Sequence, residues 1–311
     1  GDEKIELPLE MMRQLDIKGD FRITSLKALE YDISNFHLAM LAKDGIIDLD
    51  PIALDVLDGS VGSVVQLDAR KDIPTYGIKL DVDKVQVGPV ANPFLVGLQG
   101  ENDISLEGAA NLAMDIKTTG ETVNQIKKAS KGRITLDMNE TRVDNFDPEY
   151  FMRKSVAEYV DSKGFGLSKT IMGGFSPREV TVFDKIYSNI DVADGKADTQ
   201  DFLMDSKRVD VGAKGHVDFI DMAVDMVASV SLPRGKTALE KVLDEPMFVH
   251  VHGPFTALEY DIDTDKMKES TTDVLEAQAK EKLDAEKAKL KAKADAEKAR
   301  LEQKAKEEEA R

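Results

Sequence analysis

Apolar and polar positions alternate through most of the first 265 residues. In the stretch Lys43–Arg70, apolar side chains recur at every second position around two Asp-Gly pairs, Asp44-Gly45 and Asp58-Gly59. Asp-Gly tolerates the positive φ angles of tight hairpin turns, and a period of two places the apolar side chains on one face of a strand. The stretch therefore predicts antiparallel strands that are joined by hairpins, with one apolar face and one carboxylate-rich face.

The alternation changes phase at Asp50-Pro51. Apolar residues occupy odd positions before this pair, as at Leu49, and even positions after it, as at Ile52. Proline cannot donate a ladder hydrogen bond, and one extra residue is what a β-bulge inserts. Two alternatives follow: one long strand that bends at the bulge, or two short strands joined by a tight connection.

The same period of two recurs along the chain. It is found in Phe21–Met40, in Tyr76–Val82 with a change of phase at Lys84, and over an unusually long run from Asp103 to Ile116. Later alternating runs are Ile134–Met138, Ile186–Val192, Phe202–Met204, Val209–Met226, Phe248–Val251 and Leu258–Ile262. A third Asp-Gly pair, Asp194-Gly195, separates the second and third of these runs and predicts another turn. We expect about ten strands, mostly antiparallel because their connections are short.

Helices are expected at a few points only. The clearest begins at Asp147-Pro148-Glu149, which supplies a capping carboxylate, a proline in the first turn and an acidic residue near the helix N-terminus. Its apolar side chains fall on one helical face, and Gly164 ends it. Shorter helices or packed loops are expected near 94–98, 120–132 and 237–243.

The residues beyond Lys266 are rich in alanine, glutamate and lysine and contain neither glycine nor proline, which favours a helix. The leucines of this tail do not follow a sustained heptad. We therefore predict a single solvated helix over Thr272–Arg311 that packs little on the body, with a dimeric coiled coil as the alternative.

Composition narrows the function. The chain has 311 residues, no cysteine and a net charge of −17. The negative charge lies on the body of the chain, before residue 276, because Glu276–Arg311 holds 11 basic and 10 acidic residues. An acidic body repels phosphate backbones, so nucleic acid is not expected as a partner. No apolar run approaches the roughly 20 residues of a membrane-spanning helix.

Sequence motifs for catalysis or ligand binding are present only in incomplete form. Gly235-Lys236-Thr237 lacks the first glycine of a phosphate-binding loop, and the acidic run from Asp261 lacks the glycine and the final glutamate of a calcium loop. His250 and His252 would point to the same side of a strand. We expect them on a solvent-facing surface, with a metal site as the alternative. No nucleophile–base pair is apparent, so we expect no enzyme, no cofactor and no metal.

An ordered set of short motifs resembles the C-terminal domain of the AsmA family. The motifs are Ala42-Lys43-Asp44-Gly45, Leu49-Asp50-Pro51, Leu67-Asp68-Ala69-Arg70, Pro74-x-Tyr76, Val85-Gln86-Val87-Gly88-Pro89, Gly108, Gly120, Gly132, Phe183, Asp194-Gly195, Gly215-x-Val217-Asp218 and Gly253-Pro254-Phe255. The resemblance spans roughly 20–265. An N-terminal membrane helix and a preceding β region, which members of the family have, are not in this sequence.

The resemblance completes the expected architecture. The pattern predicts a mainly β protein, and the resemblance implies a long, twisted antiparallel sheet that curves into an apolar-lined groove or a partly open barrel. A few short helices and a long charged C-terminal helix complete it. We expect an N-terminal lead-in over 1–19, the β domain with helical insertions over 20–265, and the helical tail over 266–311.

The resemblance also implies a function. It indicates an envelope protein that is anchored in the inner membrane and projects into the periplasm, where it binds phospholipid or another acyl-chain lipid and supports lipid transport between the two membranes. The alternative is a periplasmic scaffold or assembly factor for outer-membrane biogenesis, with envelope proteins as partners. The residues expected to contact lipid on the groove face are Ile47, Leu49, Ile52, Leu54, Val56, Val65, Leu67, Ile78, Leu80, Val82, Leu106, Leu112, Met114 and Ile116.

Overall fold

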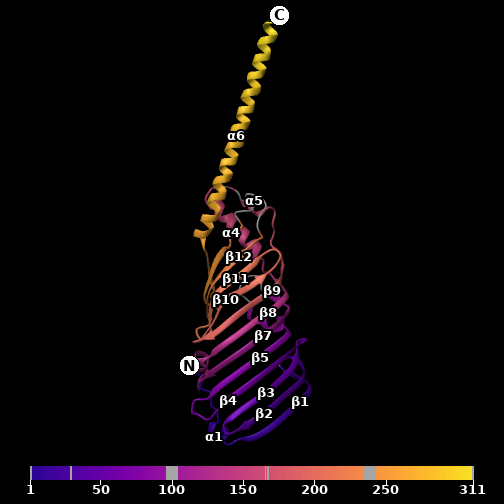
Figure 1. The fold of residues 1–311 in the computed structure, drawn as a ribbon, viewed down its shortest axis with the longest axis vertical. Helices are drawn as coiled ribbons and strands as arrows, with labels where there is room; N and C mark the ends of the chain where they lie inside the picture. Colours follow the sequence, from indigo (N-terminus) through magenta and orange to yellow (C-terminus); the bar gives the residue numbers. More distant parts are fainter. Residues whose placement is uncertain are drawn as a thin grey trace.

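The computed structural model describes residues 2–28, 30–95, 104–164, 166, 168–233 and 243–309. Over these residues it contains one antiparallel sheet of 14 strands, which is not closed (Figure 1). The strands are β1 (Asp16–Ala28), β2 (Tyr31–Lys43), β3 (Ile46–Val56), β4 (Gly59–Asp68), β5 (Thr75–Gln86), β6 (Ser105–Glu107), β7 (Ala109–Thr119), β8 (Lys131–Asp144), β9 (Val180–Ala193), β10 (Lys196–Asp205), β11 (Asp210–Asp218), β12 (Ala223–Ser231), β13 (Met247–Pro254) and β14 (Glu259–Ile262). The expected mainly β antiparallel fold is confirmed.

The strands follow one another across the sheet in chain order, except that β6 lies beside the path and pairs with β8. Strands in a sheet are about 4.8 Å apart, so the path from β1 to β14 spans roughly 60 Å. The sheet is therefore elongated along the direction in which its strands stack, with β1 near one end and β12 toward the other (Figure 1).

Two Asp-Gly turns have the predicted geometry. Asp44 and Gly45 have φ angles of 51° and 80°, and Asp194 and Gly195 have φ angles of 52° and 80°. Two successive positive φ angles are typical of the type I′ turn, whose twist matches that of the flanking strands.

The turn expected at Asp58-Gly59 is displaced by one residue. Leu57 and Asp58 take the positive φ angles, 51° and 62°, and Gly59 is the first residue of β4. A Cβ at Gly59 would lie 2.5 Å from the carbonyl oxygen of Asp83, so glycine is required here for close approach and not for the turn.

The phase change at Asp50-Pro51 is a bulge within one strand. The pairing of β3 with β4 shifts register between Leu49 and Ile52, and β3 continues without a break. Of the two alternatives, the bent strand is therefore correct. The phase change at Lys84 is also confirmed, because that residue has φ 53° and the β5–β7 register shifts around it.

Two expectations about strands were wrong. The structure has more than the ten strands expected, and the run from Asp103 to Ile116 is not one strand. It is divided at Gly108, which has φ 156°, into β6 and β7. A Cβ at Gly108 would lie 3.2 Å from the Thr141 hydroxyl oxygen, so the backbone of β8 comes close at this break. Alternation continues across it and does not show the break.

Six helices are present in the described part of the chain: α1 (Leu9–Met12), α2 (Gly88–Leu95), α3 (Val123–Ala129), α4 (Pro148–Ser162), α5 (Ser168–Met172) and α6 (Thr264–Glu309). The predicted cap of α4 is confirmed, because the Asp147 carboxylate accepts a hydrogen bond from the Tyr150 N–H at 3.0 Å. None of the described helices is both long and apolar enough to cross a membrane. The helix expected near 237–243 lies outside the described residues, apart from Leu243. Leu98, the last residue of the helix or packed loop expected near 94–98, also lies outside them.

Helix α4 packs on the C-terminal half of the sheet and forms the main core there. Met152 and Val160 of α4 are 1% and 0% exposed, and they belong to one cluster with Phe183 of β9 and Val211 of β11. Helix α6 is the continuation of β14 and projects away from the sheet (Figure 1). Thr271 near its start is buried, whereas every side chain from 283 to 298 is exposed.

Candidate functional site

One face of the sheet is mainly apolar, because the strand registers align most of the apolar positions with one another. Across the middle of the sheet, Ile52 pairs with Ser63, Ser63 with Leu80, Leu80 with Met114, and Met114 with Ile134. We define the open section of this face by its side chains on β2, β3, β4, β5 and β7: Phe36, Leu38, Met40, Ile47, Leu49, Ile52, Leu54, Val56, Val61, Val65, Leu67, Tyr76, Ile78, Leu80, Val82, Leu112, Met114 and Ile116.

Burial divides the apolar face into two sections. All side chains of the open section remain partly exposed. On the C-terminal half, a single cross-strand row on the same face is buried: Met138, Ile186, Met204, Val211, Val230 and Met247, which are 3–9% exposed. Helix α4 covers that row, and no described helix covers the open section in the same way.

The structure brings the predicted lipid-contacting residues together. All of them except Leu106 lie in the open section, on four neighbouring strands. Leu106 lies on β6, opposite Val143, and packs against the core under α4. The β2 side chains Phe36, Leu38 and Met40, as well as Val61 and Tyr76, belong to the same face but were not among the predicted residues. Their alternation with polar residues was the signal that could have identified them.

The opposite face of the sheet is polar and carries ion pairs between neighbouring strands. Lys79 of β5 lies 3.5 Å from Asp115 of β7, and Arg133 of β8 lies 2.8 Å from Asp191 of β9. Residues next to one another on a strand therefore face different surroundings, as Lys79 and Leu80 do. The two faces of the sheet therefore differ in polarity.

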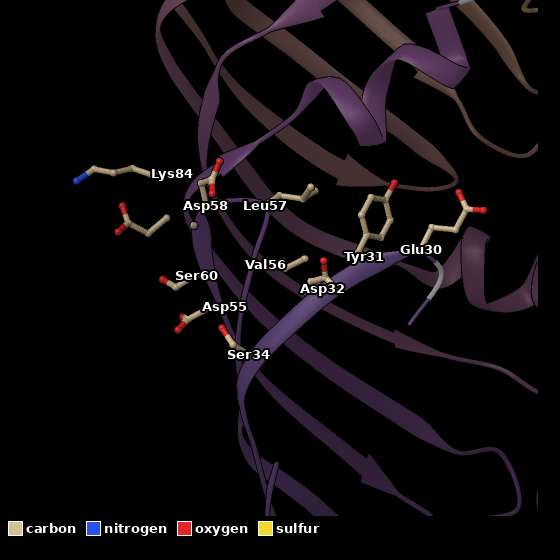
Figure 2. Close-up of a pocket in the computed structure, with 12 residues that line it drawn as sticks. Glu30, Tyr31, Asp32, Ser34, Asp55, Val56, Leu57, Asp58, Ser60 and Lys84 are labelled. Atoms are coloured by element: carbon tan, nitrogen blue, oxygen red, sulfur yellow. The ribbon is translucent and has the colours of Figure 1, made fainter. Parts of the chain in front are cut away.

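The margin of the open section is hydrophilic. A pocket of about 750 Å³ lies at the ends of β2, β3 and β5, with Val56 and Leu57 on its apolar side (Figure 2). Carboxylates provide much of its remaining lining: Glu30, Asp32, Asp55, Asp58 and Asp83. This margin is therefore a polar rim beside the apolar face.

A buried ionic cluster holds the N-terminus of α4 in place. The Glu149 carboxylate is 7% exposed and lies 2.5 Å from Arg178 and 3.1 Å from Arg153. Both guanidinium groups stack on the ring of Phe175, at 4.4 Å for Arg153 and 5.2 Å for Arg178. Asp147 also accepts a hydrogen bond from the Arg178 N–H at 2.9 Å, so the helix that covers one end of the apolar face is fixed at its start.

These features define an open antiparallel β protein with an extended apolar face, which the described helices cover at one end only. The chain belongs to the AsmA family, whose model matches residues 3–202, from the N-terminal segment into β10. No match to this chain was found among curated proteins or among solved structures. The AsmA family is associated with the cell envelope and linked to lipid transport, and its members are not known as enzymes.

Proposed function

We propose that this chain is a non-enzymatic lipid-handling module, which holds the acyl chains of phospholipids on the open section and supports their movement between the inner and outer membranes. In the whole protein, the module would project into the periplasm from an anchor in the inner membrane. The observation that carries the proposal is the open section itself, a continuous apolar surface over five neighbouring strands that remains partly exposed.

A partly exposed apolar surface over five strands calls for an apolar partner. Soluble proteins rarely leave contiguous apolar patches larger than a few hundred Å² in water. The open section is lined mainly by aliphatic side chains, and the chain has no tryptophan. Each methylene group removed from water contributes about 0.8 kcal/mol, so an acyl chain that buries eight of them would gain roughly 6 kcal/mol.

The position of the covered section also supports lipid handling. Helix α4 closes the apolar face at the C-terminal half, and the polar margin lies along one side of the open section. An acyl chain would therefore lie along the stacking direction of the strands, while a charged headgroup would stay at the water-facing margin. The polar opposite face, with its ion pairs, would remain in water.

The test is to place a charge on either face. Leu54→Asp and Leu112→Asp put a carboxylate into the open section, where burying it against lipid costs several kcal/mol. Val64→Asp is the control, because Val64 lies on the opposite face and pairs with Lys79. Phospholipid extracted from each purified variant is quantified by mass spectrometry, and folding is followed by circular dichroism.

We expect both open-section variants to fold and to lose the lipid that wild type and Val64→Asp retain. A folded Leu112→Asp variant with undiminished lipid contradicts lipid binding on this face. If Leu54→Asp and Leu112→Asp unfold while Val64→Asp does not, the face is a closed protein core. The scaffold function, which acts through protein contacts, is then favoured.

A further inference from the structure

Three of the four histidines of the chain come together on the polar face of the sheet, away from the open section. His216 lies on β11, and His250 and His252 lie on β13. Asp225 of β12 pairs in register with His216 on one side and with His252 on the other. Asp261 of β14 pairs with His250. Four consecutive strands therefore contribute imidazoles and carboxylates to one surface.

The distances within this cluster are short. The rings of His250 and His252 are 4.6 Å apart between centroids. Nε2 of His250 lies 2.8 Å from Oδ1 of Asp225, and Nε2 of His252 lies 3.0 Å from Oδ2 of Asp261. One ligand atom from each of His250, His252 and Asp261 lies within 4.8 Å of the other two.

These separations are close to those of a metal centre. Zn²⁺ is bound tetrahedrally at about 2.0–2.1 Å by histidine nitrogens and carboxylate oxygens, so neighbouring ligand atoms are about 3.3 Å apart. The two histidine–carboxylate distances already fall near that value. Because the side chains are 31–76% exposed, small rotations can bring the remaining atoms together.

His37 shows what a solitary histidine–carboxylate pair looks like in this protein. Its Nε2 lies 3.0 Å from Oδ2 of Asp20. Among the described residues, His37 does not belong to any group of three or more side chains that could hold a metal ion. At His250 and His252, two such pairs lie side by side. Asp225 lies between them and His216: its Oδ1 is 2.8 Å from Nε2 of His250, and it pairs in register with both His216 and His252, so one carboxylate lies next to all three histidines.

We propose that His250, His252, Asp261 and Asp225 form a binding site for a divalent transition-metal ion, with Zn²⁺ as its representative. Mixed nitrogen and oxygen donors suit Zn²⁺, Ni²⁺ and Cu²⁺, whereas Mg²⁺ and Ca²⁺ are bound by oxygen ligands alone. His216 is not one of the ligands, since its Nε2 faces the Lys196 ammonium nitrogen at 3.1 Å. Sequence spacing favoured two solvent-facing histidines and left a metal site as the alternative, because it did not show that Asp225 and Asp261 come from neighbouring strands.

The site would link three strands at the C-terminal edge of the sheet. β14 has only four residues, pairs with β13 alone among the described strands, and is followed directly by α6. A metal ion held by β12, β13 and β14 would fix this short edge strand and the start of the long helix. This role is independent of lipid binding, because the site and the open section are on opposite faces.

The experiment is calorimetric titration of the untagged full chain with zinc chloride. We expect one Zn²⁺ per chain with a micromolar dissociation constant, weakened at least tenfold by His250→Ala or by Asp261→Asn and abolished in His250→Ala/His252→Ala. His37→Ala is the matched control and should change the dissociation constant less than twofold. Magnesium and calcium chloride at millimolar concentration should not compete.

A second readout is the melting temperature. Zinc should raise it for wild type and for His37→Ala, but not for the double variant, whose melting temperature without zinc should match that of wild type. The absence of saturable binding overturns the proposal. So does equal binding by the double variant, or a loss in His37→Ala as large as that in His250→Ala.

Discussion

Ile78 and Ile186 show how strongly the surroundings of one residue type differ along the apolar face. Ile186 on β9 is 3% exposed in the row under α4, whereas Ile78 on β5 belongs to the open section and keeps part of its side chain exposed. The cost of truncating a buried side chain has two parts, the lost transfer free energy and the cavity that remains. A side chain without a covering layer leaves no closed cavity.

The matched substitutions Ile186→Ala and Ile78→Ala should therefore differ in their effect on stability. We expect Ile186→Ala to lower the free energy of unfolding of the lipid-free protein by about 3 kcal/mol and Ile78→Ala by less than about 1 kcal/mol. Urea denaturation followed by circular dichroism measures both. Equal losses would show that the open section is packed as tightly as the covered row.

The motif Leu67-Asp68-Ala69-Arg70 has a structural role at the end of β4, where it is held by hydrogen bonds. Asp68 accepts hydrogen bonds from the Arg70 side chain at 2.7 and 2.9 Å and from its backbone N–H at 3.1 Å. These bonds lower the pKa of Asp68 to about 2. Ala69 is fully buried, and its N–H donates to the Gly45 carbonyl oxygen, so the motif joins β4 to the preceding turn.

The sign of the pH dependence follows from the lowered pKa. An unfolded aspartate has a pKa of about 3.9, so the stabilisation by Asp68 is present above that pH and is lost as the pH falls toward 2. The melting temperature of wild type should exceed that of Asp68→Asn by a constant margin above pH 5, and the margin should shrink below pH 4. A margin that is independent of pH would show that the charge of Asp68 contributes nothing.

At the scale of elements, α4 decides where the apolar face is covered. Its start was predictable from Asp147, Pro148 and Glu149, and so was its apolar side, which includes Met152 and Val160. The part of the sheet on which α4 packs was not predictable from the sequence. The N-terminus of α4 is held in place by a salt bridge between Glu149 and Arg178, and Arg178 is distant in sequence.

Removing this salt bridge should loosen α4. Glu149→Ala leaves Arg153 and Arg178 without their carboxylate, and since both guanidinium groups are partly exposed, we expect a loss of about 2 kcal/mol in the free energy of unfolding. Glu158→Ala is the control on the same helix, because its pair with Lys154 is exposed and 3.9 Å long. That change should cost less than about 0.5 kcal/mol. Similar losses in both variants would contradict a structural role for the cluster.

Sequence predicted the strands and their two faces well, because each strand keeps a period of two that burial on one side requires. It placed the hairpins at Asp44-Gly45 and Asp194-Gly195, where the residues themselves prefer positive φ angles. It did not place the turn at Leu57-Asp58 or the break at Gly108, since both depend on the close approach of another strand. Alternation also looks the same in a covered and in an open section, so only the structure separates them.

At the scale of the molecule, the sheet and α6 have different relations to solvent. The start of α6 lies against α4, around a pocket lined by Tyr159, Val160 and Thr271, whereas the side chains from 283 to 298 are all exposed. The helix was predicted from its composition, but its contact with α4 was not, because the apolar residues there are few and do not form a seam.

Truncation of α6 should therefore have an effect that depends on where it ends. A chain that stops after Lys282 should keep the wild-type melting temperature within about 1 °C, because the described side chains that are removed, from 283 to 298, are all exposed. A chain that stops after Asp263 should melt several degrees lower, since Val160 would lose its cover. Equal melting temperatures for the two truncations would contradict packing of the helix start on α4.

Photo-crosslinking along β5 tests most directly whether acyl chains lie on the open section. A benzophenone amino acid is introduced in turn at each position from Gly77 to Val82 in cells that synthesise the whole protein, and crosslinked phospholipid is detected by mass spectrometry after purification. Ile78, Leu80 and Val82 belong to the open section, whereas Gly77, Lys79 and Asp81 face the other way. If acyl chains lie on the open section, lipid adducts should alternate with a period of two, at 78, 80 and 82 only. Adducts at all six positions, at none of them, or only at the odd-numbered ones would contradict it.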